Sequence, residues 1–112
     1  MTTKIAGLFL AMGLLGLLFA FSKGVYAENT ATDIGEEKFK SLCAMCHVGG
    51  GNIINPKKTL HKADREANNV KTADDIIKLM RNPGPKMTKF NEKIVPEKEA
   101  RAIADYVLKT FN

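Results

Sequence analysis

The only two cysteines of the chain stand three residues apart and are followed at once by a histidine, in the segment Cys43-Ala44-Met45-Cys46-His47. Cysteines at this spacing serve three chemistries. A redox dithiol sits at a helix start within a strand–helix unit, and no strand pattern flanks this pair. A structural zinc ion needs four ligands, whereas the chain has one further histidine, His61, which stands alone.

The third chemistry is the attachment of c-type haem. In C-x-x-C-H segments the two thiols bind the haem vinyl groups and the histidine binds the iron. We therefore predict that Cys43 and Cys46 form thioethers to one covalent haem and that His47 is the proximal iron ligand. A thiol–disulfide protein without haem is the alternative that this spacing leaves open.

The predicted distal ligand is Met87, which lies in the loop Pro83-Gly84-Pro85-Lys86-Met87-Thr88-Lys89-Phe90. The prolines restrict the freedom of this loop before it meets the haem. An open site, Met80 and His61 remain alternatives, although Met80 falls on the apolar side of a helix and His61 in a polar one. Methionine and histidine together raise the potential of the iron, which suits electron transfer, whereas an open or displaceable ligand suits sensing or ligand binding.

The elements that must position these residues read as four short helices without a convincing strand. They are expected from Thr32 or Asp33 to Leu42, from Thr59 to about Asn68, from Thr72 to the stop at Asn82-Pro83-Gly84-Pro85, and from Pro96 to Phe111. Thr72 and Asp75 form a capping-box pattern. The segment Gly49-Gly50-Gly51-Asn52 is expected to be a loop that Pro56 extends. The chain is therefore predicted to be all-α.

Two helices show which side they bury. The third predicted helix is expected to bury Ile76, Ile77, Leu79 and Met80. The last predicted helix is expected to bury a continuous face of Ala100, Ile103, Ala104, Val107, Leu108 and Phe111. So small a core is thin by itself. A haem would supply the large apolar centre against which short helices can pack.

The first 27 residues have the layout of a secretory signal. Lys4 precedes an apolar run from Ile5 to Phe21, and Val25-Tyr26-Ala27 places small residues at the two positions that a signal peptidase reads. We predict cleavage after Ala27, which leaves a monohaem domain at residues 28–112; an uncleaved membrane anchor is the alternative. The formal net charge of +5 includes two lysines of this segment, and no arginine-rich patch indicates nucleic-acid binding.

These motifs resemble the class I c-type cytochromes, most closely the cytochrome c6 type. The segment from Cys43 to Gly50 is similar to that group's haem site, Lys86-Met87-Thr88-Lys89-Phe90 falls at its methionine-ligand loop, and Ile103–Leu108 resembles its C-terminal helix. The resemblance implies that Gly35 and Phe39 meet Tyr106. It implies a small cytochrome c fold of about four helices around one haem.

The function that this resemblance implies is single-electron transfer by a monomer, not enzymatic catalysis. A haem-based sensor with a displaceable ligand is the other function considered. The expected location is the periplasm rather than a thylakoid lumen, because Asn82-Pro83-Gly84-Pro85 is not the glycine-rich form of the photosynthetic carriers. A second departure from the family concerns the methionine ligand: Thr88 follows Met87 where the family usually has proline. Redox partners, membrane-associated complexes among them, would meet Lys57, Lys58, Lys86 and Lys89. Asn52 and Pro56 are expected in the haem environment.

Overall fold

The computed structural model describes residues 30–112, so the segment assigned above to a signal, residues 1–27, lies outside the described part. The helices are α1 (Ala31–Leu42), α2 (Lys62–Ala67), α3 (Ala73–Arg81) and α4 (Glu97–Thr110), with a 3-10 turn η1 (Val48–Gly50) between α1 and α2. No strand occurs within residues 30–112. The all-α prediction is confirmed, and none of the described helices is long and apolar enough to cross a membrane.

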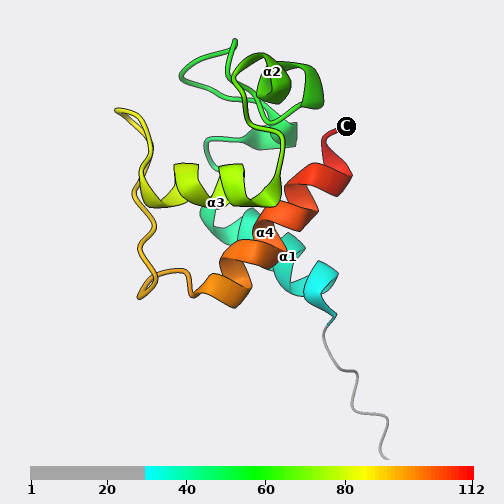
Figure 1. Cartoon of the computed structure of the whole chain (residues 1–112), viewed down its shortest axis with the longest axis vertical. Coiled ribbons are helices and arrows are strands. Elements are labelled where there is room, and N and C mark those ends of the chain that lie inside the picture. Colours follow the sequence, from blue (N-terminus) through cyan, green and yellow to red (C-terminus); the bar gives the residue numbers. More distant parts are fainter. Residues whose placement is uncertain (1–29) are drawn as a thin grey trace, which may run out of the picture.

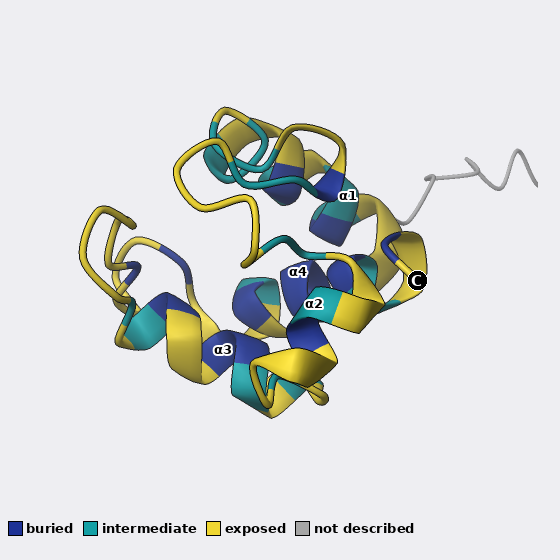
Figure 2. Cartoon of the chain, turned by 90° about the horizontal axis from the view of Figure 1, so that it is seen from above, coloured by how far each residue is buried: buried dark blue, intermediate teal, exposed yellow. Residues whose placement is uncertain are grey.

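Helices α1 and α4 cross at the centre, α3 lies beside α4, and α2 stands apart above them (Figure 1). Their buried residues lie on the sides that face one another, whereas large parts of the loops and most of α2 are exposed (Figure 2). A long loop connects the end of α3 to the start of α4 along one edge of the molecule (Figure 1). The helices therefore leave the region between this loop and the segment after α1 for the functional site.

Capping boxes begin two of the helices. Before α3, the hydroxyl of Thr72 accepts from the Asp75 amide and the Asp75 carboxylate accepts from the Thr72 amide at 2.9 Å, as predicted. Before α1 the same arrangement joins Thr30 and Asp33. The predicted cap at Thr32 or Asp33 was therefore wrong, because the threonine that has an acid three residues later is Thr30.

Helix α2 begins later than predicted. Its N-cap is His61, not Thr59. The Thr59 hydroxyl donates to the Asp64 carboxylate, so it stabilises the first turn from outside the helix. Pro96 likewise stands one position before α4.

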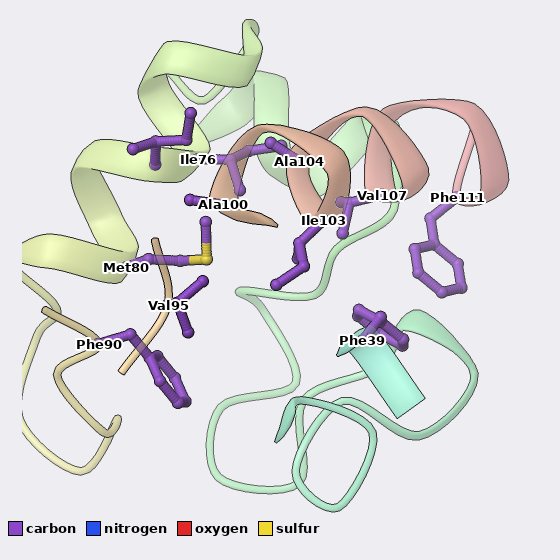
Figure 3. Close-up of a cluster of buried hydrophobic side chains, with 11 residues drawn as sticks. Phe39, Ile76, Met80, Phe90, Val95, Ala100, Ile103, Ala104, Val107 and Phe111 are labelled. Atoms are coloured by element: carbon purple, nitrogen blue, oxygen red, sulfur yellow. The ribbon is translucent and has the colours of Figure 1, made fainter. Parts of the chain in front are cut away.

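The core lies between α1, α3 and α4 (Figure 3). It contains Phe39, Ile76, Ile77, Met80, Phe90, Val95, Ala100, Ile103, Ala104, Val107 and Phe111. Leu79, predicted to be buried on α3, is 43% exposed. Leu79 lines the cavity described below.

The crossing of α1 and α4 depends on a glycine. A Cβ atom on Gly35 would collide with the carbonyl oxygen of Ala102 and lie 3.1 Å from the Cβ of Tyr106. The rings of Phe39 and Tyr106 pack with centroids 5.3 Å apart. The predicted meeting of Gly35 and Phe39 with Tyr106 is confirmed.

Candidate haem-binding site

One turn of backbone brings the two cysteines and the histidine to the same side. Cys43 is the C-cap of α1, and its carbonyl oxygen accepts from the amides of Cys46 (3.1 Å) and His47 (2.9 Å). Residues three and four apart in such a turn share a face. All three side chains are half-buried and line one cavity.

The imidazole of His47 is held in one orientation. Its Nδ1 lies 2.8 Å from the carbonyl oxygen of Gly51. Because a carbonyl only accepts hydrogen bonds, Nδ1 carries the proton and Nε2 keeps the lone pair that a metal needs. The turn that supplies this carbonyl requires glycine, since Gly49 and Gly50 have φ of 58° and 79° and a Cβ on Gly50 would collide with the ring of Phe111.

The cavity beside these residues has a volume of about 590 Å³, within the range of pockets that bind small organic ligands. Its walls come from the segment after α1, from α2, from α3 and from the loop after α3. The apolar lining residues are Leu42, Ile54, Leu60, Val70, Ile76, Leu79, Met80, Pro85, Met87 and Phe90. A largely apolar cavity with thiols and an imidazole at one wall fits a covalently attached haem.

The charged lining of the cavity is mostly basic. Lys58, Arg65 and Lys86 line it together with one acid, Asp64, which accepts from Thr59. A haem carries two propionate groups, so this excess of positive charge fits it.

The thiol chemistry argues against a redox dithiol. Within the described residues both cysteines are free, and burial raises the pKa of the Cys43 thiol from 9.0 to about 11. Reactive C-x-x-C pairs have a lowered thiol pKa, so the shift at Cys43 is in the opposite direction. The environment of this pair favours cofactor attachment over thiol–disulfide exchange.

Met87 lines the same cavity as His47, although the two are far apart in the sequence. Its side chain is 38% exposed, and the preceding Lys86 has a left-handed φ of 77°. Met80 also lines the cavity but is only 4% exposed and belongs to the core (Figure 3). His61 does not line it; its ring packs edge-on against Phe111 with centroids 5.9 Å apart.

The other predicted site residues differ in position. Asn52 lines the cavity and also organises its own loop, because its side chain accepts from the amides of Ile54 and Asn55 and donates to the carbonyl of Lys58. Pro56 is exposed and does not line the cavity.

Among the predicted lysines, Lys58 and Lys86 line the cavity, whereas Lys57 and Lys89 are exposed outside it. Arg65, which is buried in the cavity wall, was not predicted from the sequence. Its only signal is weak: the positions three and four residues away hold no acid, so it has no ion-pair partner on its own helix.

An all-helical domain that brings a Cys-x-x-Cys-His turn to an apolar cavity defines the chain as a small c-type cytochrome. Comparison with known proteins agrees. Residues 30–107 match the family model described as cytochrome c oxidase, cbb3-type, subunit III. The chain is 42% identical to cytochrome c6 of Rippkaea orientalis over 66% of each chain, and 36% identical to cytochrome c6 of Cyanidium caldarium over 81% of this chain and 80% of that protein.

Solved structures give the same assignment. Outer membrane cytochrome F (OmcF) of Geobacter sulfurreducens is 45% identical with a TM-score of 0.68, over 70% of this chain and 99% of that one. Cytochrome c6C of Synechococcus sp. PCC 7002 is 30% identical with a TM-score of 0.66, over 70% and 95% of the two chains. The chain belongs to the c-type cytochrome family and is similar to cytochrome c6. It is an electron carrier with covalently bound c-type haem, and its one attachment segment is consistent with a single haem.

Proposed function

We propose that Cys43 and Cys46 hold the haem, that His47 and Met87 would bind its iron, and that the chain shuttles single electrons without catalysing a reaction. The observation that carries this proposal is that His47 and Met87, from two separate segments, line one cavity. His47 presents Nε2 as its only lone pair. When bound, the haem supplies the one-electron redox centre; the residues of this chain hold it and exclude water from it.

If both His47 and Met87 bind the iron, electron transfer is the expected activity. The two residues would leave no position on the iron for a substrate, and little in the protein would need to move between redox states. If Met87 were displaceable instead, the chain would suit gas binding or sensing, which is the second function considered.

The electron is proposed to pass to and from partner proteins outside the cytoplasm, membrane-associated complexes among them. Covalent haem attachment takes place outside the cytoplasm, which fits residues 1–27 as a cleaved secretory signal. The periplasm is favoured over a thylakoid lumen because Asn82-Pro83-Gly84-Pro85 departs from the photosynthetic carriers. Lys58 and Lys86, at the cavity mouth, are suited to attract acidic partner surfaces.

The ligation test compares Met87→Leu with Met80→Leu in protein matured in a bacterial periplasm. Leucine conserves the volume of methionine, so the pair separates ligation from packing. We expect the weak far-red absorption band of a sulfur–ferric iron bond in wild type and in Met80→Leu, and its loss in Met87→Leu. A wild-type spectrum without this band, together with carbon monoxide binding to the reduced form, would replace the carrier by a ligand-binding cytochrome.

Attachment is tested on the cysteines. Each single serine variant at Cys43 or Cys46 should keep one thioether, and the double variant should lose covalent haem. Haem staining after denaturing electrophoresis reports this directly. Haem that stays on the double variant would contradict the assignment.

A further inference from the structure

Arg65 is the one charged residue that is buried within the described part of the chain, with 5% of its surface exposed. It lies on α2, and it lines the cavity. A buried charge without an opposite partner is costly, because little water remains to solvate it. The group that offsets the charge of Arg65 is therefore of functional interest.

The protein itself supplies only neutral partners to this guanidinium. Arg65 Nε donates to the carbonyl of Leu60 at 2.7 Å, and Nη2 lies 3.4 Å from the carbonyl of Phe111. A guanidinium has five N–H donors. Among residues 30–112 Nη1 has no hydrogen-bond partner in the protein, and because every fully buried side-chain nitrogen there has one, Nη1 keeps some exposed surface. The described ion pairs do not include Arg65.

The acid next to Arg65 is occupied elsewhere. The Asp64 carboxylate accepts from the hydroxyl of Thr59 and does not lie within ion-pair distance of the guanidinium. The other basic residues of the cavity wall, Lys58 and Lys86, are exposed, and water screens their charge. Arg65 is thus the cavity residue whose charge most requires an anion.

We propose that Arg65 binds a carboxylate of the haem and is the buried counter-charge of the cofactor. The planar guanidinium can donate two parallel hydrogen bonds to a carboxylate. Its bonds to Leu60 and Phe111 fix its position between the cavity wall and the C-terminal end of α4, so the contact ties the cofactor to the fold. Arg65 is a positioning and charge-compensating residue, not an iron ligand.

This inference rests on the haem occupying the cavity, but it does not depend on Met87 as the ligand. An absorption spectrum establishes the haem first, and the far-red band tests Met87 separately. Failure of the Arg65 contact in a haem-loaded protein therefore counts against this inference alone.

The direct test is a crystal structure of the wild-type holoprotein. We expect an oxygen atom of a haem propionate about 3 Å from an Arg65 Nη atom. Both propionates directed away from Arg65 would overturn the proposal. This measurement uses no variant, so a failure of variants to fold does not affect it.

The energetic test is the midpoint potential at pH 8 of Arg65→Met, Arg65→Lys and Arg101→Met. Arg101 pairs with Asp74 outside the cavity, so its variant removes the same charge from the surface. We expect Arg65→Met to lower the potential, because an uncompensated carboxylate favours ferric iron. Arg65→Lys should restore most of the shift, and Arg101→Met should shift the potential far less. If Arg65 were purely structural, Arg65→Met would lower the melting temperature, and its midpoint potential would equal that of Arg101→Met. This result would contradict the proposal.

Discussion

The guanidinium of Arg81 lies 2.9 Å from the carbonyl oxygen of Phe90, so the last residue of α3 holds the far end of the loop that carries Met87. The same Nη1 atom donates to the carbonyl of Val95 at 2.8 Å, and Nη2 pairs with Glu97 at 3.3 Å. One side chain therefore fixes the loop at two carbonyls and connects it to the start of α4.

Replacing Arg81 by alanine should destabilise the holoprotein by about 2–4 kcal/mol, because two carbonyls in a buried region lose a charged donor. Each kcal/mol corresponds to a fall in Tm of about 4–8 °C. The far-red band should also disappear at a lower temperature than in wild type. Arg101→Ala, which breaks surface ion pairs with Asp74 and Glu97, is the control and should destabilise far less, because water screens exposed pairs. Equal losses in the two variants would show that the Arg81 contacts do not hold the loop.

Gly35→Ala should destabilise the protein by about 1–3 kcal/mol, the usual cost of overpacking. The added methyl group collides with backbone, at the Ala102 carbonyl, which cannot move aside as a side chain can. Thermal unfolding measures the loss. Gly84→Ala is the matched control, because a Cβ there meets nothing within 4 Å. A Gly35→Ala variant as stable as Gly84→Ala would mean that α1 and α4 tolerate a wider crossing.

Asp75 should make the domain sensitive to acid. Hydrogen bonds from the amides of Lys71 (3.0 Å) and Thr72 (2.9 Å) lower the pKa of its carboxyl group below the ordinary value. The unfolded chain then binds a proton at a higher pH than the folded one. The stabilisation is therefore complete above the unfolded pKa, about 3.9, and is lost as the pH falls through the folded pKa.

Asp75→Asn should consequently flatten the acid side of the curve of unfolding free energy against pH. Chemical denaturation between about pH 5 and pH 2 measures this slope. Glu92→Gln, an exposed loop substitution that also removes one carboxylate, is the control for the loss of a negative charge. An unchanged slope in Asp75→Asn would refute the linkage.

If residues 1–27 are a cleaved secretory signal, the mature protein should begin at Glu28 and be found in the periplasmic fraction. A small residue at position 27 is required for cleavage, so Ala27→Arg should block processing. Mass spectrometry of the purified protein identifies its first residue. A membrane-bound product that retains residues 1–27 would instead establish the anchor.

The sequence by itself determined the chemistry of this protein. The C-x-x-C-H spacing predicted haem, because attachment needs two thiols and a histidine on one turn, and that is a local property of the chain. Helices α3 and α4 were likewise predicted from capping residues and apolar spacing. The start of α1 was misplaced although the sequence contains its signal: Thr30 has an acid, Asp33, three residues later, which is the capping-box pattern.

Tertiary structure alone decided which of the remaining side chains line the cavity and which of them are buried. Leu79 follows the apolar spacing of α3, yet it lines the cavity and is exposed. Arg65 shows only a weak signal in the sequence, and it is buried where its guanidinium donates to the carbonyls of Leu60 and Phe111, which come from two separate segments. Burial and partners of this kind arise from segments distant in the sequence, so no local pattern contains them.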